Sequence, residues 1–291
     1  MQGARVTVDF VRPRTLDETF EILGSDEDAH LIAGGVSVVL LMGSGLMEAS
    51  RLVSLDRVVG LDGIQVAEDR LEIGALSTHQ QLATHPLLRE YFSAAAEMFT
   101  SIGNIRVRLA GTIGGNLAHA DPAQDPAVML TVLGATVVVA GPDGERVVPV
   151  IDLADGPLSV ALAHEEVITR VHVPLPHAGE VSAYTKFLPG TYDDYATVSV
   201  ACRLRLGASG DIAEAVLAAG AVGPTVVVLA DAAQVLVGRH PDPDVLAELE
   251  QRVRESVSPH GDRRGSGDYK RAMTGVIAAR TVAKALSGQG Q

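Results

Sequence analysis

The sequence predicts an α+β fold, in which strands and helices are mixed without a regular βα repeat. The chain has 291 residues, enough for about two domains. Strand-like and helix-like segments follow one another irregularly over its first 175 residues, whereas residues 182–228 contain three or four successive antiparallel strand candidates. Helical patterns fill the remainder. A mixed N-terminal part is therefore expected to precede a sheet with helices.

The N-terminal segments predict a β-α-β-turn-α unit. Residues 5–13 are expected to form a short strand, and Thr15 is expected to cap a helix over residues 15–23. Residues 29–35 have the pattern of a buried strand running into a glycine pair, and residues 36–46 form an apolar helical segment.

The next segments predict further hairpins, strands and helices. One expected helical stretch, residues 77–101, should break at Pro86, because proline cannot continue a helix. The other expected elements are a strand over 51–58, a hairpin over 63–76, a helix over 122–134, a hairpin over 135–152 turning at "GPDG", and a strand over 165–176.

The character of the sequence changes at "LPHAGE", residues 175–180, where we expect a domain boundary. The first domain is then 1–177 and the second is 178–287. The second should contain helices over 230–238, 243–257 and 266–288 in addition to its strands.

Composition argues against several classes of protein. The formal net charge is −13, whereas nucleic-acid binding relies on a basic surface; aromatic residues are only 3% and tryptophan is absent, which disfavours base stacking. The longest apolar run is far shorter than a membrane span, and the N-terminal residues lack the long apolar run typical of a secretory signal. We expect a soluble, cytoplasmic protein with no membrane span and no nucleic-acid partner.

Cys202 is the one cysteine of the chain. An internal disulfide is therefore impossible, and so is an iron–sulfur cluster held by four thiolates of this chain. Its position in an alternating apolar strand favours a small core residue, although a nucleophile is the alternative.

Two glycine segments, far apart in sequence, each lie beside hydroxyl or amide side chains. Gly34 and Gly35 precede Ser37, and Gly114 and Gly115 lie between Thr112 and Asn116. Glycines let backbone amides approach an anion, and a helix N-terminus adds a favourable dipole. Each segment is also consistent with an ordinary tight turn. Together they suggest one shared pyrophosphate, although neither a complete G-x-G-x-x-G nor a Gly-Lys-Ser/Thr motif occurs.

A metal site is an alternative interpretation of "HADPAQD". His119, Asp121 and Asp125 are ligand types, but two prolines stiffen the segment and no second His or carboxylate cluster completes a catalytic centre. We therefore expect no metal site here. A serine-nucleophile elbow is also absent from the sequence.

The motifs "AGGVS" (33–37), "LEIGALST" (71–78) and "TIGGNLAHADPAQD" (112–125) resemble the FAD-binding medium subunit of molybdenum hydroxylases, the family of carbon monoxide and xanthine dehydrogenases. The likeness extends to "SAYTK" and "DYKRAM" near the C-terminus. It implies a vanillyl-alcohol-oxidase-type (PCMH-like) FAD-binding domain of two subdomains, about 1–57 and 58–177. A C-terminal domain with a three-stranded antiparallel sheet and helices would follow.

The resemblance implies that FAD is the cofactor and assigns contacts with it, but it assigns no catalytic residue. Asp125 would accept ribityl hydroxyls, Ile102 and Ile168 would pack on the flavin, and Lys186 would stabilise its reduced, anionic form. From the residues alone, Asp125 also suits a helix N-terminus, both isoleucines suit the core, and Lys186 suits the surface. The implied cofactor-binding residues are Leu31, Ile32, Ala33, Gly34, Gly35, Val36, Ser37, Val38, Ile102, Thr112, Ile113, Gly114, Gly115, Asn116, Asp125, Ile168 and Lys186.

The resemblance also implies partners. A large subunit with the molybdenum cofactor would hydroxylate the substrate, and a small subunit with two [2Fe–2S] clusters would relay electrons to FAD, in a dimer of heterotrimers. NAD, oxygen or a quinone would be the acceptor. A non-catalytic scaffold that retains the fold is the alternative function. The sequence does not identify the substrate.

Two further features lie in the predicted C-terminal domain: the segment after Lys186 and a basic stretch near the last helix. Many relatives carry an Arg shortly after the lysine, whereas "KFLPGTYDDY" has no basic residue, so Tyr192 and Tyr195 are candidates to lie beside the flavin. The basic stretch with Arg263, Arg264, Lys270 and Arg271 suits either partner docking or a solvated helix start.

Overall fold

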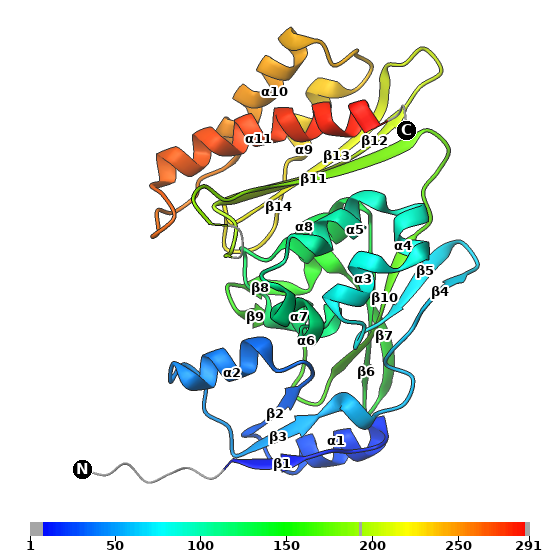
Figure 1. Cartoon of the computed structure of the whole chain (residues 1–291), viewed down its shortest axis with the longest axis vertical. Helices are drawn as coiled ribbons and strands as arrows, with labels where there is room; N and C mark the ends of the chain where they lie inside the picture. The colour runs from blue at the N-terminus through cyan, green and yellow to red at the C-terminus, as the bar shows by residue number, and fades with distance from the viewer. Residues whose placement is uncertain (1–7, 192–193, 289–291) are drawn as a thin grey trace.

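The computed structural model describes residues 8–191 and 194–288, and its elements form three units arranged along the long axis (Figure 1). A small parallel sheet lies at one end, an antiparallel sheet with short helices lies in the middle, and a second antiparallel sheet with long helices lies at the other end. The predicted α+β class is confirmed. Among the helices of these residues, none has the length and apolar character needed to cross a bilayer.

The first unit is the β-α-β-turn-α arrangement that the sequence predicts. Its parallel strands lie in the order β1-β3-β2. The Thr15 hydroxyl accepts a hydrogen bond from the Glu18 amide at 3.1 Å, which confirms the predicted N-cap. The elements are β1 (Asp9–Val11), α1 (Leu16–Gly24), β2 (Ala29–Ile32), α2 (Val36–Gly43) and β3 (Arg51–Ser54), followed by a 3₁₀ turn, η1 (Leu55–Arg57).

The middle unit is built on a five-stranded antiparallel sheet in the order β4-β5-β10-β6-β7. Both predicted hairpins are present. The strands are β4 (Ile64–Ala67), β5 (Arg70–Gly74), β6 (Thr136–Gly141), β7 (Gly144–Pro149) and β10 (Val167–Pro174). A 3₁₀ turn, η2 (Val150–Asp152), and a two-stranded hairpin, β8 (Ala154–Gly156) with β9 (Ser159–Val160), complete the sheet side.

Six short helices cover the middle sheet, three more than the patterns predict. Residues 77–101 break at Pro86 as predicted, and again at Phe92, whose backbone leaves the helical region (φ −140°, ψ 56°). The second glycine segment begins a helix rather than a free turn, because the Thr112 hydroxyl caps it. The helices are α3 (His79–Thr84), α4 (Pro86–Tyr91), α5 (Ser93–Thr100), α6 (Ile105–Ala110), α7 (Ile113–His119) and α8 (Asp125–Val132).

The third unit is an antiparallel sheet in the order β11-β12-β13-β14. Three long strands agree with the prediction, and a two-residue edge strand is added to them. The elements are β11 (Glu180–Phe187), β12 (Val198–Leu206), β13 (Ile212–Gly220), β14 (Val227–Val228), α9 (Ala230–Ala233), η3 (Gln234–Leu236), α10 (Pro243–Ser256) and α11 (Gly267–Ser287).

Cys202 lies fully buried in β12 beneath α11, with its Sγ 3.6 Å from the Thr281 carbonyl oxygen. Burial raises the pKa of the Cys202 thiol to about 12. Because the thiolate is the reactive form, this cysteine is a core residue and not a nucleophile.

The two faces of the third sheet belong to different cores. One face packs under α10 and α11, while the other packs on α5 and α8 of the middle unit. Tyr184, Ala201 and Ala218 accordingly belong to the same apolar cluster as Phe99 and Met129. The C-terminal sheet is thus joined to the middle unit by continuous apolar packing.

Candidate cofactor site

A cavity of about 620 Å³ lies where the three units meet. This volume is within the range of cofactor sites in proteins. The structure brings fifteen of the seventeen predicted residues to its wall: Leu31, Ala33, Gly34, Gly35, Val36, Ser37, Val38, Ile102, Thr112, Gly114, Gly115, Asn116, Asp125, Ile168 and Lys186.

Ile32 and Ile113 do not line the cavity. Ile113 is fully buried in the core of the middle unit, because the first turn of α7 directs it toward that core. Ile32 is buried beneath Gly35, where an added Cβ would lie 3.3 Å from the Ile32 Cδ1 atom. Both side chains support the backbone beside the cavity and do not form its surface.

The two glycine segments, though far apart in sequence, lie against each other. A Cβ added to Gly34 would lie 1.7 Å from the Ala110 carbonyl oxygen, so this backbone approach requires glycine. A Cβ added to Gly115 would lie 3.7 Å from the Ala33 Cβ. The glycines therefore let two backbone segments meet at one wall of the cavity.

The N-terminus of α2 opens into the cavity. Gly35 is its N-cap, with φ +75° and no side-chain capping bond. Among the described residues, no hydrogen-bond acceptor is found for the amides of Val36, Ser37 and Val38, all of which line the cavity. Unsatisfied first-turn amides together with the helix dipole favour an anion at this position.

The N-terminus of α7 is closed, which differs from the expectation that both segments offer amides. Its first three amides already donate within the protein: Ile113 to the Ser77 carbonyl, Gly114 to the Ala75 carbonyl and Gly115 to the Thr112 hydroxyl. Gly114 and Gly115 act here through close packing. Asn116 still offers a polar group, because its Oδ1 is buried beside the cavity without a donor.

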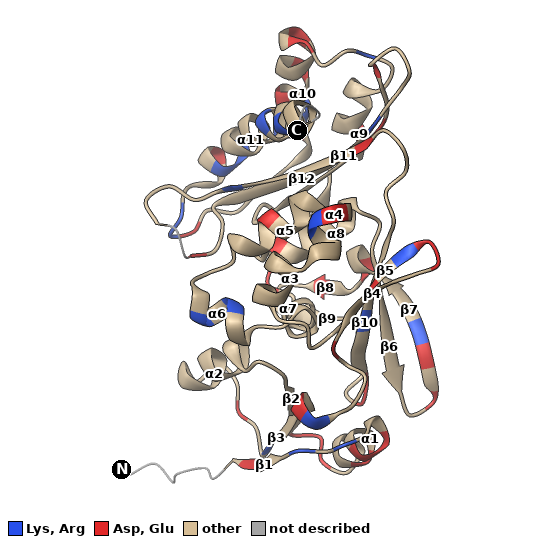
Figure 2. Ribbon diagram, turned by 45° about the vertical axis from the view of Figure 1, so that its right-hand side comes forward, with Lys and Arg blue, Asp and Glu red and all other residues tan. Residues whose placement is uncertain are grey.

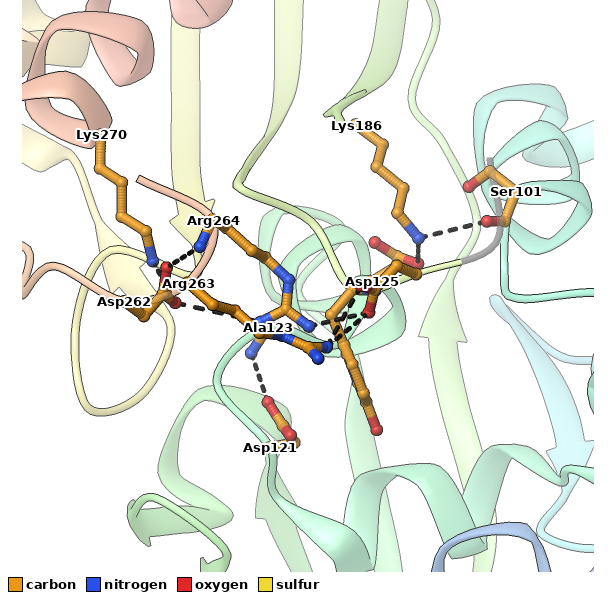
Figure 3. Close-up of polar contacts among 11 residues, drawn as sticks. Ser101, Asp121, Ala123, Asp125, Lys186, Asp262, Arg263, Arg264 and Lys270 are labelled. Atoms are coloured by element: carbon orange, nitrogen blue, oxygen red, sulfur yellow. Dashed lines mark hydrogen bonds and ion pairs between the residues drawn. The ribbon is translucent and has the colours of Figure 1, made fainter. Parts of the chain in front are cut away.

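A buried ion pair lies at the other end of the cavity. The Lys186 ammonium in β11 is 2.8 Å from the Asp125 carboxylate in α8 and donates to the Ser101 carbonyl oxygen at 3.2 Å (Figure 3). The Asp125 side chain is 5% exposed and the Lys186 side chain 9%. Tyr184 donates a short hydrogen bond to the second Asp125 oxygen. Removal from water raises the pKa of Asp125, and Lys186 opposes that rise.

The positions of Lys186 and Asp125 distinguish between the alternative interpretations of these two residues. Lys186 is not a surface lysine, and Asp125 is both the first residue of α8 and the partner of Lys186. Asp121 accepts a hydrogen bond from the Ala123 amide at 2.8 Å. Within residues 8–191 and 194–288, no three His, Cys, Asp or Glu side chains are grouped to hold a metal ion.

His79 is a cavity residue that the sequence reasoning missed. Its ring stacks on Phe99 with centroids 5.7 Å apart, and its buried Nδ1 has no partner among the described residues. Burial lowers the pKa of His79 to about 4, so the imidazole is neutral at pH 7. The available sequence signal for His79 was its position directly after the motif "LEIGALST". Its stacking partner, Phe99, lies in another helix, so the sequence did not indicate this contact.

The buried imidazole should make the fold acid-sensitive. Between pH 6.5 and about 4 the unfolded chain binds a proton that folded His79 rejects, so stability falls as the pH is lowered through this window. His79→Phe should reduce the loss of unfolding free energy between pH 7 and pH 4 by up to about 3 kcal/mol. Urea unfolding followed by circular dichroism measures this. His260→Phe makes the same replacement at an exposed position and is the matched control.

The ion pair predicts a second stability effect. Asp125→Asn leaves a buried ammonium uncompensated and should lower the free energy of unfolding by about 3 kcal/mol. The double variant Asp125→Leu, Lys186→Met removes both charges and should recover most of that loss. A double-mutant cycle by urea unfolding measures the coupling, and independent, additive effects would contradict the assignment.

Comparisons with known proteins agree with this arrangement. Residues 5–176 match the model of the FAD binding domain in molybdopterin dehydrogenase, and residues 183–285 match the carbon monoxide dehydrogenase flavoprotein C-terminal domain. The chain is 31% identical to the carbon monoxide dehydrogenase medium chain of Afipia carboxidovorans over 95% of its own length and 96% of the relative's.

Solved structures show the same fold. Carbon monoxide dehydrogenase from Hydrogenophaga pseudoflava matches with a TM-score of 0.92 at 29% identity, covering 96% of this chain and 97% of the other. Quinoline 2-oxidoreductase from Pseudomonas putida 86 matches with a TM-score of 0.92 at 30% identity, covering 97% and 98%.

The fold and the cavity define an FAD-binding subunit of an oxidoreductase, with the expected vanillyl-alcohol-oxidase-type domain and the C-terminal domain behind it. The chain belongs to the family of FAD-binding medium subunits of molybdenum hydroxylases, which includes the carbon monoxide and xanthine dehydrogenases.

Proposed function

We propose that this chain is the electron-transferring flavoprotein subunit of a complex whose molybdenum centre hydroxylates a substrate. Electrons would arrive through [2Fe–2S] clusters on a partner and leave to an external acceptor. The observation that carries the proposal is the meeting, around one cavity, of the open α2 terminus, the paired glycine segments and the Asp125–Lys186 pair.

FAD, when bound, supplies two-electron redox chemistry. We propose that the amides of Val36, Ser37 and Val38 bind its pyrophosphate, because this helix terminus lacks acceptors within the described protein. The orphan Asn116 oxygen would accept from a cofactor donor. We propose that the seventeen residues predicted from the sequence form the FAD site. Ile32 and Ile113 would support the backbone beside the cofactor and would not touch it.

At the opposite end of the cavity, Lys186 would place a positive charge beside the flavin ring. Asp125 fixes the ammonium at 2.8 Å, and Tyr184 in turn donates to Asp125. With both carboxylate oxygens engaged, Asp125 would chiefly orient Lys186, and its remaining acceptor capacity would serve a ribityl hydroxyl. Ile102 and Ile168, both buried at the wall, would pack on the ring system.

Partner subunits are part of the proposal. Relatives carry the names of medium chains of carbon monoxide and glyceraldehyde dehydrogenases, and one solved relative names a molybdenum cofactor. We propose a large molybdenum subunit, a small iron–sulfur subunit, assembly as a dimer of heterotrimers and a cytoplasmic location. The proposed domain limits are 1–177, with subdomains of about 1–57 and 58–177, and 178–287.

An apolar face beside the cavity would contact such a partner. α2 and α6 have no buried residue, and α2 carries no charged residue (Figure 2). Leu40 is 66% exposed and Leu109 60% exposed. Apolar side chains exposed together are typical of interaction sites. The members of this apolar face are Val39, Leu40, Leu46, Ile105 and Leu109.

Visible absorption tests the proposed function. The purified chain, or the complex that contains it, should show a flavin spectrum, and the FAD released on denaturation should approach one equivalent per chain. A folded chain without flavin would instead support the alternative, a scaffold that has kept the fold. A substrate screen on the intact complex would identify what the molybdenum subunit hydroxylates.

Gly115→Val should remove FAD while leaving the fold largely intact. The added Cβ would lie 2.9 Å from the Thr112 Oγ1 atom, and the branched side chain would enter the contact with Ala33. Flavin content and the circular dichroism spectrum measure the two effects. Gly43→Val is the matched control, because an added Cβ meets nothing within 4 Å there. Full flavin occupancy in Gly115→Val would place the pyrophosphate elsewhere.

Charges on the apolar face should weaken assembly without removing FAD. Val39→Asp with Leu109→Asp, at two exposed positions that do not line the cavity, should reduce co-purification of the large and small subunits about tenfold, the effect typical of central interface residues. Val147→Asp is the control, since Val147 is 61% exposed on β7, away from α2. Unchanged co-purification of the double variant would exclude this face as the interface.

A further inference from the structure

Arg264 joins the loop before α11 to the segment that follows β11. Its Nη2 atom is 2.8 Å from Asp194 Oδ1, and its guanidinium carbon lies 5.4 Å from the centre of the Tyr195 ring. The Arg264 side chain is 16% exposed. One side chain thus makes an ion pair and a cation–π contact with two consecutive residues, in a partly desolvated setting where both are strengthened.

A second set of contacts holds Arg264 itself. Its amide donates to Asp262 Oδ1 at 2.8 Å, and its guanidinium lies 3.9 Å from Asp262 Oδ2. Lys270, which is 4% exposed, donates to Asp262 at 2.8 Å (Figure 3). It also donates to the Ala221 carbonyl at 3.3 Å. The Arg264 and Lys270 side chains are therefore largely buried, that of Arg271 is partly exposed, and that of Arg263 is largely exposed.

Tyr195 and Asp194 both line the cavity, at the end where Lys186 and Asp125 lie. The Arg264 guanidinium holds the pKa of Asp194 below its ordinary value. Burial raises the pKa of Tyr195 to about 12, so the phenol is neutral at pH 7. Since residues 187–195 contain no basic residue, the cation that fixes them comes from far along the chain. Tyr192 lies outside the described residues.

We infer that Arg264 is a positioning residue that holds Tyr195 as a wall of the cavity and so shields its Lys186 end from solvent. Exclusion of water strengthens the Asp125–Lys186 interaction, because charges attract more strongly in a medium of low dielectric constant. The inference deepens the proposed function and rests on it only for the identity of the ligand. Arg263, 72% exposed and 3.2 Å from Asp194, shares the ion pair and is not among the residues that line the cavity.

Nitration of tyrosines in the cofactor-free chain tests the packing without any redox activity. With tetranitromethane and peptide mass spectrometry, Tyr195 should be nitrated roughly fivefold faster in Arg264→Gln than in the wild type, since a cation–π contact and an ion pair are lost together. Arg263→Gln should react as the wild type does. Buried Tyr184 and exposed Tyr269 serve as internal references, and unchanged rates at both show that the fold is retained.

Solvent access to the bound cofactor is the second measurement. After anaerobic reduction of the FAD-loaded chain with dithionite, two electrons and one proton pass from the anionic reduced cofactor to added O₂, a second proton comes from solvent, and H₂O₂ forms. This reoxidation should be roughly fivefold faster in Arg264→Gln and in Tyr195→Ala, whereas Tyr195→Phe, which keeps the cation–π contact, should react as the wild type does. Arg264→Gln in a Tyr195→Ala background should add nothing further.

The outcomes separate the two proposals. Wild-type rates of Tyr195 nitration in Arg264→Gln, with both reference tyrosines unchanged, would overturn the inference. Faster reoxidation in Arg263→Gln than in Arg264→Gln would also overturn it, because the exposed ion pair would then be the important contact. A wild-type chain that binds no FAD would sink the proposed function, while the nitration result would still decide the role of Arg264.

Discussion

The buried Asp125–Lys186 pair is the interaction on which the architecture depends most. Two charges withdrawn from water are tolerated only when each has close partners, and here Ser101 and Tyr184 supply the remaining hydrogen bonds. Asp125 starts a helix of the middle unit, while Lys186 belongs to the C-terminal sheet. The pair is therefore formed only when the two units dock, and the apolar packing of α5 and α8 on that sheet keeps it dry.

The two glycine segments have similar sequences but different structural roles. Gly34 permits direct backbone contact with α6, and Gly35 adopts a left-handed conformation that starts α2 with its amides open. Gly114 and Gly115 instead begin a helix whose amides are already bonded, so their contribution is close packing. An anion is consequently favoured at one of the two termini and not at both, although both line one cavity.

Local patterns predicted most of the elements, because capping, turn and periodicity signals act over a few residues. Thr15 and the "GPDG" hairpin are examples. The break at Phe92 and the inward direction of Ile113 were missed, since tertiary packing decides them. The motif resemblance identified fifteen of the residues that line the cavity, but not His79, and not the contact between Asp194 and Arg264, which are 70 positions apart. No short-range sequence pattern predicts a contact between residues so far apart in the chain.

The apolar cluster shared by the middle unit and the C-terminal sheet has a consequence for how this chain can be recombined with its relatives. Tyr184, Ala201 and Ala218 fill a core whose other members come from the first domain. A chimera that joins the first domain of one relative to the second domain of another would combine side chains of mismatched volume in this shared core. The two segments thus behave as one inherited module, and exchange between relatives is expected to preserve them as a pair.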